Sequence, residues 1–414
     1  MNGSILEVIV VGAGHAGLIT SYYLKHLALE HMIFERGRIG ETWRSQRWDN
    51  FRMITPDRLN VLQGSTAKIK NPDGYSGAQT LVNAMKDYVS AYQLPVTENS
   101  TVISIDKAPG SPVFTVKVSH DNDMVRSYDC WQVIVASGAM SQKVIPAMSE
   151  NIDHSIKQLH SIEYKNASLL PEGGVLVVGG GQSGCDIAYD VAKSGRQVFL
   201  SSNGSPTLSR SYRGKDILDW LILSKQMESG SDRAGPTSQG PIISTDADIP
   251  FFDLKFLEAQ GIKLLGSLDK VDGTILFFRD GIGKIVQAAR EYDNVQRKAI
   301  DDYISASQVE TGDNLAEKNV SLSSAEFSSQ KKLDLKTSNI STIVWATGYT
   351  GNFDFIKLPV FNRHGLVEHH EGVTAVDGLY FVGFPWQRAQ KSGFIFGVKE
   401  YASFVANKAY SALR

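Results

Sequence analysis

Two glycine-rich segments carry the clearest chemical pattern in this chain of 414 residues. Gly12–Gly17 and Gly179–Gly184 both fit the spacing G-x-G-x-x-G, and each follows a short apolar run. Such glycines allow a tight turn and let a pyrophosphate approach the backbone N–H groups that open the following helix. We therefore predict two dinucleotide sites. The predicted contacts are Gly12, Gly14, His15, Ala16 and Gly17 in the first segment, and Gly179, Gly181, Gln182, Ser183 and Gly184 in the second.

A carboxylate follows the first segment where a ribose ligand is needed. Glu35 closes the next apolar run and lies 23 residues after Gly12. An acid at this place accepts hydrogen bonds from a ribose diol. The alternative is a loop glycine cluster followed by a surface glutamate. The complete order of strand, turn, helix, strand and acid favours the dinucleotide site.

The second segment lacks this acid, since the same offset from Gly179 reaches Ser202. A carboxylate there would repel the 2′-phosphate of NADPH, whereas a small hydroxyl admits it. Arg210, Arg213 and Lys215 follow downstream. A guanidinium suits a phosphate best, so Arg210 or Arg213 is the expected ligand. The segment thus predicts NADPH rather than NADH, and the alternative is that these cations lie on a solvated surface.

Two other apolar runs end in a small turn. Val133–Gly138 reads V-I-V-A-S-G, and Ile343–Tyr349 reads I-V-W-A-T-G-Y. Such an ending puts a compact turn beside a cofactor, although each run alone is also compatible with an ordinary strand and turn. The expected cofactor contacts are Ala136, Ser137 and Gly138 in the first run, and Ala346, Thr347 and Gly348 in the second.

The apolar runs also predict the elements that position these motifs. Strands are expected at 6–11 and 31–34 with a helix at 18–27 between them, and the same order recurs over 175–200. This alternation predicts an α/β fold with parallel sheets. Runs at 101–106 and 113–119 predict a small antiparallel β element. Further strands are expected at 131–137, 340–346 and 379–382.

Bulk properties exclude several classes of function. A net charge of -2 and a pI near 6.5 give no electrostatic case for binding nucleic acid or an anionic membrane. No apolar run approaches the roughly 20 residues that cross a bilayer. Cys130 and Cys185 do not form a CxxC pair, so neither a metal site nor a redox dithiol is indicated. Low cysteine use and the lack of a visible signal peptide predict a cytoplasmic protein.

Together these motifs resemble the class B flavin-dependent monooxygenases, a group of flavoproteins with two dinucleotide-binding domains. The chain is most similar to a bacterial branch related to the plant YUCCA enzymes. The resemblance covers nearly the whole chain, and beyond the glycine segments it includes Gly40–Arg44, Trp48–Pro56, Pro72–Tyr75, Tyr212–Asp216 and Gly378–Gln387. It implies FAD at the first glycine segment and NADPH at the second.

The resemblance implies two Rossmann-like dinucleotide-binding domains, the NADPH domain being inserted into the FAD domain. We expect residues 1–150 to form the first segment of the FAD domain. Residues 151–337 would form the NADPH domain, with loops or insertions at 229–240 and 310–336. Residues 338–414 would complete the FAD domain with a C-terminal helix.

Further cofactor contacts are implied outside the glycine segments. The Gly40–Arg44 stretch would contact the flavin, and the backbone at Val102 would meet the adenine. Ser392 would begin the last helix, whose N-terminus would stabilise negative charge on the reduced ring. For Trp43, a core aromatic is the alternative. The implied FAD contacts of this kind are Glu35, Arg36, Thr42, Trp43, Arg44, Val102 and Ser392.

The monooxygenase fingerprint FxGxxxHxxxY is matched only in part, at 154–164. His160 and Tyr164 occupy the His and Tyr positions, but His154 and Ile156 replace the Phe and the Gly. A tyrosine at the last position argues against the Baeyer–Villiger branch. We interpret His160 as a residue that couples the two domains rather than as a general base.

The resemblance implies that NADPH reduces FAD, and that O2 then oxygenates a small organic substrate through a flavin hydroperoxide. Nitrogen, sulfur or an electron-rich ring would be the site of oxygenation. Asn50, Arg52 and Thr55 are the candidate catalytic residues, with packing of the domain junction as their alternative role. Segments 251–265 and 386–396 would line the substrate pocket. A flavin reductase or oxidase and a nucleotide-sensing regulator remain alternative functions, and family members often form homodimers.

Overall fold

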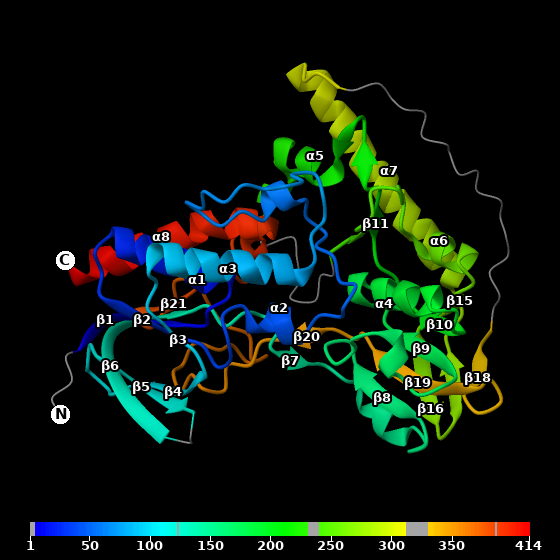
Figure 1. Cartoon of the computed structure of the whole chain (residues 1–414), viewed down its shortest axis with the longest axis horizontal. Helices are drawn as coiled ribbons and strands as arrows, with labels where there is room; N and C mark the ends of the chain where they lie inside the picture. Colours follow the sequence, from blue (N-terminus) through cyan, green and yellow to red (C-terminus); the bar gives the residue numbers. More distant parts are fainter. Residues whose placement is uncertain (1–4, 122–123, 231–239, 312–329, 386) are drawn as a thin grey trace.

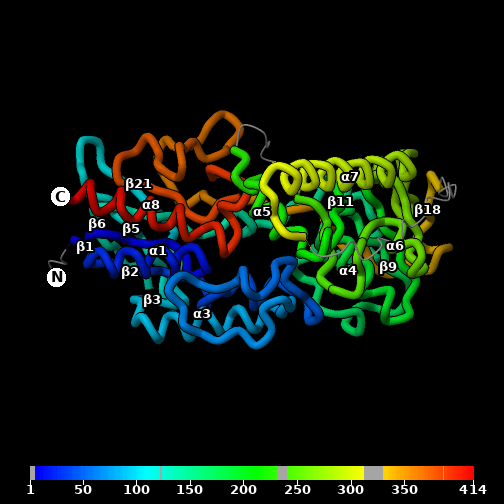
Figure 2. Tube along the Cα trace, turned by 90° about the horizontal axis from the view of Figure 1, so that it is seen from above, coloured from blue at the N-terminus to red at the C-terminus, as the bar shows by residue number. Residues whose placement is uncertain are grey.

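The computed structural model describes residues 5–121, 124–230, 240–311, 330–385 and 387–414. The chain forms two lobes, each built on a parallel sheet with helices packed on it (Figure 1). Strand β1 begins and helix α8 ends at the outer end of the first lobe (Figures 1 and 2). The predicted α/β fold with two dinucleotide-binding domains is confirmed.

The first lobe is organised by one sheet with the order β3-β2-β1-β6-β5-β4, and β21 pairs with β6. Strand β1 lies parallel to β2 and β6, so its apolar residues are buried on both faces of the sheet. The strands are β1 (Leu6–Val11), β2 (His31–Phe34), β3 (Val96–Thr97), β4 (Ser100–Lys107), β5 (Phe114–His120), β6 (Met124–Val135) and β21 (Leu379–Phe381).

The long strand β6 joins two kinds of pairing. From Cys130 to Val135 it runs parallel to β1, while from Met124 to Cys130 it runs antiparallel to β5. The predicted antiparallel element is therefore present as β4 and β5, and it extends the parallel sheet through β6.

Helices cover one face of this sheet. Val8 and Val10 of β1 pack in the same core as Leu18 of α1 and Val398 of α8, and α1 lies against α8. The other face carries Ile9 and packs in a separate apolar cluster. The helices of this lobe are α1 (His15–His26), α2 (Glu41–Ser45), α3 (Ala78–Tyr92) and α8 (Ile395–Leu413).

The second lobe has a parallel sheet of order β15-β10-β9-β19-β8. One face is covered by α4 and α6, and the other by the antiparallel sheet β16-β17-β18. The parallel strands are β8 (Lys157–His160), β9 (Gly174–Val178), β10 (Val198–Ser201), β15 (Lys263–Leu265) and β19 (Ile340–Trp345). The small sheet consists of β16 (Leu268–Asp272), β17 (Ile275–Phe278) and β18 (Lys332–Asp334).

Four helices belong to the second lobe: α4 (Gln182–Lys193), α5 (Ile217–Leu223), α6 (Leu254–Ala259) and α7 (Ile282–Ser307), counted over the described residues. Helix α7 runs along the outside of the lobe and shares a core with α5 (Figure 2). Short pairs complete the fold: β7 (Gln142–Lys143) with β20 (Tyr349–Thr350), β11 (Thr207–Leu208) with β14 (Ile242–Ile243), and β12 (Ser211–Tyr212) with β13 (Lys215–Asp216).

The structure corrects the expected boundary at residue 338. Strand β19 lies between β9 and β8 in the second sheet, so the chain returns to the first sheet only after it, first at a bridge between Ile356 and Ile105 of β4 and then at β21. Part of the expected polar insertion is also ordered structure, because β18 pairs with β17. Residues 312–329 of that insertion and 231–239 of the expected loop lie outside the described residues.

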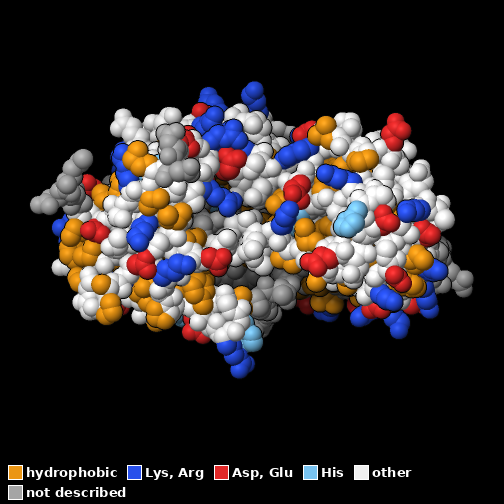
Figure 3. All heavy atoms as spheres, turned by 90° about the horizontal axis from the view of Figure 1, so that it is seen from below, with side chains coloured by type: hydrophobic (Ala, Val, Ile, Leu, Met, Phe, Trp, Pro, Cys, Tyr) orange, Lys and Arg blue, Asp and Glu red, His pale blue; other side chains and the backbone are white. Residues whose placement is uncertain are grey.

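On the face drawn in Figure 3, acidic and basic side chains of the described residues are interspersed, and neither sign of charge dominates the surface. The same view shows that the molecule is hollowed between its lobes. Among the described residues, no helix is both long enough and apolar enough to cross a membrane.

The packing of β19 against the small sheet gives a test of the second core. Trp345 is fully buried there, and its indole N–H donates to Gln158 Oε1 at 3.0 Å. We expect Trp345→Ala to lower the free energy of unfolding by about 3–5 kcal/mol, the usual cost of emptying a large core position. Trp131→Ala, at a position 37% exposed, should change it by less than about 1 kcal/mol. Urea denaturation of both variants measures the difference, and equal losses would contradict this core.

Candidate functional site: two nucleotide cradles and their junction

The first glycine turn packs tightly against the end of β6. Gly12 has a φ of +106°, and a side chain there would lie 2.7 Å from the carbonyl oxygen of Ala136. A side chain at Gly17 would collide with the carbonyl oxygen of Gly12. The Ala136 N–H in turn donates to Val11 O at 2.9 Å. Only glycine therefore allows this turn, helix α1 and strand β6 to approach so closely.

The turn leaves the N-terminus of α1 open. Gly14 is the N-cap, and no described side chain caps this end. A side chain at Gly14 would have no described atom within 4 Å. The unpaired backbone N–H groups and the positive end of the helix dipole suit a pyrophosphate at this place.

Glu35 closes the other side of the same turn. Its carboxylate accepts the N–H of Ala13 at 2.7 Å and that of Gly37 at 3.0 Å. Burial raises the pKa of Glu35, and these two bonds oppose that shift. A carboxylate can accept about four hydrogen bonds, so two acceptor positions remain for ribose hydroxyls. The Ser100 N–H donates to Glu35 O, which brings β4 and Val102 beside this acid.

Helix α2 also begins beside the turn, because the Gly40 N–H donates to Ala13 O at 3.1 Å. Thr42, Trp43 and Arg44 lie on this helix and are half-buried, whereas Arg36 is exposed. The indole of Trp43 packs in the first core and carries the guanidinium of Arg47 at 4.8 Å, so its alternative role as a core aromatic fits.

Unsatisfied polar atoms test whether these residues fit FAD. His15 Nε2, Arg44 Nη2 and Ser137 Oγ are buried without a hydrogen-bond partner in the described part of the chain. Unpaired buried polar groups are uncommon in native proteins and call for a ligand or water. All three belong to the predicted FAD contacts, so these residues fit a polar dinucleotide. Burial lowers the pKa of His15 to about 4, which keeps its ring neutral.

Ser392 is placed differently from the prediction. It lies in a short 3₁₀ turn, Gln390–Gly393, and α8 begins at Ile395 with Phe394 as its N-cap. The Ser392 hydroxyl is fully buried and accepts the N–H groups of Arg388 and Ala389. Ser392 therefore holds the turn that precedes the last helix.

The second glycine turn repeats the geometry of the first. Gly179 has a φ of +122°, and a side chain there would collide with the carbonyl oxygen of Ala346. Gly184 packs on the carbonyl oxygen of Gly179 in the same way, and Gly181 is the N-cap of α4 without a cap from any described side chain. Gly348, after β19, has open space around it within the described structure.

Two predicted cofactor contacts near the start of α4, Gln182 and Ser202, form hydrogen bonds within the protein. Gln182 bonds the backbone of Ile243 in both directions, at 3.1 Å and 2.9 Å, and so braces β14. Ser202 is fully buried under Gly180, and its hydroxyl accepts the N–H of Gly204. This hydroxyl lies beneath the turn, and the phosphate contact predicted for Ser202 stays a prediction.

The predicted phosphate ligand Arg210 is engaged within the protein, so its phosphate role stays a prediction. Arg210 is 2% exposed, and its guanidinium is paired with Asp216. Arg213 is more exposed, but its Nε already donates to Asp301 on α7 at 2.5 Å. The sequence shows these cations, but it does not show that they pair with Asp216 and Asp301.

A cleft of about 820 Å³ lies where the lobes meet. Trp48, Arg52 and Tyr75 line it from the first lobe, and Asp186 and Phe252 line it from the second. Polar and charged side chains make up most of its lining, among them Asp73, Asp190 and Lys193, and Trp48, Tyr75 and Phe252 add aromatic surface.

The three predicted catalytic residues follow one another along this junction. Asn50 Nδ2 donates to Asp190 Oδ1 at 2.8 Å, and Arg52 Nη1 donates to Tyr75 O at 3.3 Å. Both side chains line the cleft. Thr55 is buried away from it and donates to Asn60 Oδ1 at 2.6 Å. Asn50 and Thr55 thus match the alternative role of packing the junction.

His160, which we expected to couple the two domains, makes its bond within one lobe. His160 is fully buried and bonds Gly348 O at 3.1 Å through Nε2, which links two strands of the same lobe. Tyr164 donates to Asp190 Oδ2 at 2.5 Å, on the carboxylate that also binds Asn50. The bond between the lobes is therefore Asn50–Asp190, and Tyr164 holds the Asp190 carboxylate from within the second lobe.

The comparisons with known proteins agree with this architecture. A family model described as pyridine nucleotide-disulphide oxidoreductase matches residues 9–227, just over half of the chain. The chain belongs to this family. The match covers both glycine turns, and membership in the family implies a flavin and a nicotinamide cofactor.

Individual relatives refine the family match. The chain is 29% identical to an uncharacterized CzcO-like oxidoreductase of Geobacillus kaustophilus, over 97% of this chain and 98% of that relative. It is 23% identical to the probable indole-3-pyruvate monooxygenase YUCCA9 of Arabidopsis thaliana, over 71% and 70% of the two chains. A flavin-containing monooxygenase from Stenotrophomonas maltophilia shares the fold, with a TM-score of 0.70, 17% identity and full coverage of both chains. The predicted resemblance to the class B flavin-dependent monooxygenases is confirmed.

The open space at Gly14 makes it possible to test the predicted FAD site at the first glycine turn, here called the first cradle. We expect Gly14→Ala to fold without FAD and to lose at most about 1 kcal/mol, because alanine is a poorer N-cap than glycine. Its methyl group would enter the predicted pyrophosphate position, so the FAD dissociation constant should rise about tenfold or more. Gly240→Ala, which also meets open space, should change neither quantity. Flavin fluorescence titration measures the affinity, and unchanged affinity in Gly14→Ala would contradict the placement.

Asp186 gives a prediction for pH. Burial raises its pKa to about 7; the Gln182 bonds oppose this shift and the Asp190 carboxylate adds to it. The folded state therefore keeps a proton that the unfolded state has already lost between about pH 4 and pH 7. Its contribution to stability is full at low pH and is lost as pH rises through this window. Asp186→Asn should remove the effect, at most about 4 kcal/mol for a group that is only partly buried. Parallel unfolding profiles of both proteins from pH 5 to pH 8 would contradict it.

Proposed function

We propose that this protein is an FAD-dependent monooxygenase that uses NADPH and O2 to oxygenate a small organic substrate. The reaction would insert one oxygen atom at nitrogen, at sulfur or in an electron-rich ring. The observation that carries the proposal is the pair of glycine turns with the same geometry, one in each lobe. A nicotinamide nucleotide bound at one turn would serve as the electron donor to a flavin bound at the other.

The relatives support a monooxygenase within the oxidoreductase family. Both the Arabidopsis relative and the Stenotrophomonas structure carry that activity in their names. The two cysteines of this chain are buried, and burial raises the pKa of Cys130 to about 12 and raises that of Cys185. Neither thiol is poised for disulfide exchange, which separates the proposal from a reaction run on the protein's own dithiol.

The first cradle would bind FAD through the residues already described. The N-terminus of α1 would hold the pyrophosphate, and Glu35 would accept the ribose hydroxyls. Arg44 Nη2 and Ser137 Oγ would donate to polar groups of the same cofactor. When bound, FAD would supply the chemistry, taking a hydride from NADPH and passing electrons to O2. The N-terminus of α4 would hold the nicotinamide nucleotide.

The cleft at the junction would receive the substrate. Trp48 and Phe252 present aromatic surface there, and both are more than nine-tenths buried. Arg52 is exposed on the same cleft and keeps only one bond to the backbone, so it is the candidate catalytic residue free to meet a bound molecule. Phe252 belongs to the predicted pocket segment 251–265. Phe394 and Phe396 of the other predicted segment pack on each other, and Trp386 lies outside the described residues.

NADPH stays the proposed nucleotide. Position 202 offers no carboxylate that would repel a 2′-phosphate, and Arg213 is more exposed than Arg210. A cytoplasmic location and a homodimer also stay predictions.

Rapid mixing of the FAD-loaded protein tests the proposal. We expect NADPH to bleach the flavin faster than NADH does. On mixing with O2, the oxidised spectrum should return after a delay, and an amine, sulfide or indole that is a substrate should shorten the delay and reduce peroxide release. Immediate reoxidation with one peroxide per NADPH, unchanged by any candidate substrate, would favour the reductase or oxidase alternative. A flavin that neither nucleotide reduces would overturn the proposal.

A further inference from the structure

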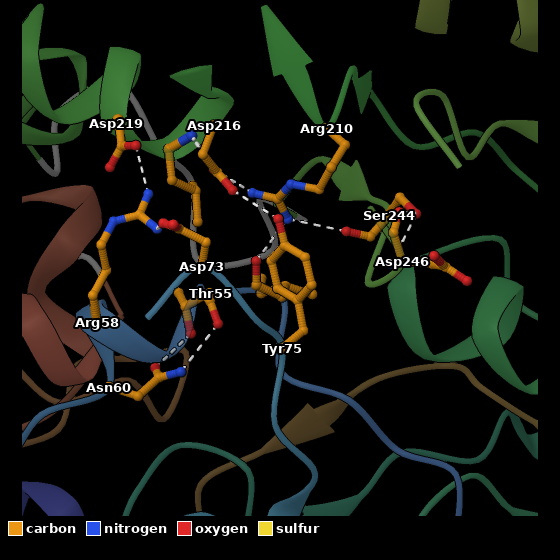
Figure 4. A network of polar contacts seen from close by, with 12 residues as sticks. Thr55, Arg58, Asn60, Asp73, Tyr75, Arg210, Asp216, Asp219, Ser244 and Asp246 are labelled. Carbon is orange, nitrogen blue, oxygen red and sulfur yellow. Dashed lines mark hydrogen bonds and ion pairs between the residues drawn. The ribbon is translucent and has the colours of Figure 1, made fainter. Parts of the chain in front are cut away.

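We infer that Arg210 is a positioning residue, which fixes the backbone of the first lobe at Ile54 to the second lobe. The inference rests on the proposed function, because such positioning matters for a rate only if two cofactors react across the junction. Arg210 lies between β11 and β12, and its side chain reaches across the junction toward residues 54–75 (Figure 4).

The guanidinium joins backbone atoms of both lobes. Arg210 Nη1 donates to the carbonyl oxygen of Ile54 at 2.8 Å and to that of Ser244 at 3.0 Å. Ile54 belongs to the first lobe and directly precedes Thr55, whereas Ser244 belongs to the second. One nitrogen atom therefore sets the distance between the two segments.

An acid and an aromatic ring hold the guanidinium in place. Arg210 Nη2 is paired with Asp216 Oδ1, and the guanidinium lies over the ring of Tyr75 at 4.8 Å. Tyr75 comes from the first lobe, and its hydroxyl donates to the other oxygen of Asp216 at 2.9 Å. Asp216 also caps α5 by accepting the Leu218 N–H. The Arg210–Asp216 pair thus joins the two lobes and the start of a helix.

A buried charge of this kind is sensitive to the shape of its side chain. Arg210 and Asp216 are both almost entirely buried, and an isolated ion at such a place is costly. The planar fork of arginine directs two nitrogens at once to a carboxylate and to two carbonyl groups. A lysine ammonium has no such fork, so it would preserve the charge but not the hydrogen bonds that connect the two lobes.

The neighbouring pairs show why the link acts on the cleft. Arg58 of the first lobe binds Asp219 of the second at 2.5 Å, and it also pairs with Asp73 (Figure 4). Tyr75 and Asp73 line the cleft, as does Ser244. A shift at Arg210 is therefore transmitted to the wall of the proposed substrate site. Displacements of about 1 Å between reacting groups can cost roughly a hundredfold in rate.

The test compares Arg210→Lys with Arg290→Lys in the full-length, FAD-loaded protein. Arg290 is a matched control, because it pairs with the buried Asp253 at 3.1 Å within the second lobe and does not reach the first. Flavin reduction is followed at saturating NADPH and, separately, at saturating NADH. We expect Arg210→Lys to slow the limiting reduction roughly ten- to hundredfold with both nucleotides. The ratio of the two dissociation constants should stay that of the wild type.

Hydrogen–deuterium exchange without nucleotide gives a readout that is independent of activity. Arg210→Lys should speed the exchange of amides in 53–60 and 72–76, whereas Arg290→Lys should not. Tyr75→Phe removes a single hydroxyl and should produce a smaller change in the same amides, so the inference stays testable if Arg210→Lys fails to fold.

The outcomes separate the two proposals. Unchanged exchange in these segments, or a loss of rate equal to that in Arg290→Lys, would overturn the positioning role. A weaker affinity for NADPH alone would make Arg210 a phosphate ligand and overturn it too. A wild-type flavin that neither nucleotide reduces would overturn the proposed function, and the exchange experiment would still decide whether Arg210 joins the lobes.

Discussion

The architecture depends on one steric constraint that occurs once in each lobe. The first glycine of each turn, Gly12 or Gly179, lies so close to an alanine carbonyl that a side chain could not be accommodated. The alanines, Ala136 and Ala346, directly follow β6 and β19, the strands that pair with β1 and β9. This contact aligns three things at one sheet edge: a turn, the free end of a helix and a second small turn. A dinucleotide needs all three at once, so the local packing requirement and the binding site have the same origin.

Much of this could be predicted from the sequence, because the constraint leaves local traces. The glycine spacing, Glu35 and the Ala-Ser-Gly and Ala-Thr-Gly endings all lie within short segments, and the structure puts each of them at a nucleotide cradle. The strand limits at Leu6–Val11 and His31–Phe34 follow directly from apolar runs between turns. The order of strands is less visible. Strand β19 joins the second sheet through pairing with distant strands, and no local pattern distinguishes that outcome from a return to the first sheet.

The sequence is least informative about charged side chains. Arg210 and Arg213 have the residue type and position expected of phosphate ligands, and the structure pairs both with aspartates. Asp216 is close in sequence, but Asp301 lies on α7, which no motif marked. Asp190 is similar: it meets Asn50 and Tyr164 only because α4 packs on the junction. An ion pair depends on the relative position of elements, and hydrophobic periodicity does not encode that position.

The two glycine turns have the same backbone geometry but differ in the side chain that lies behind the turn. This difference indicates that the two cradles do not bind the same nucleotide. In the first, the Glu35 carboxylate binds the N–H of Ala13, so a negative group stands ready beside the ribose position. In the second, the equivalent place holds Ser202, whose small side chain fits beneath Gly180 because that residue has no side chain of its own. A carboxylate at position 202 would need both more space and a cationic partner, and a 2′-phosphate nearby would repel it. Glycine at position 180 and serine at position 202 thus depend on each other for packing. It leaves position 202 without negative charge, while the first cradle keeps a carboxylate buried by means of two backbone hydrogen bonds.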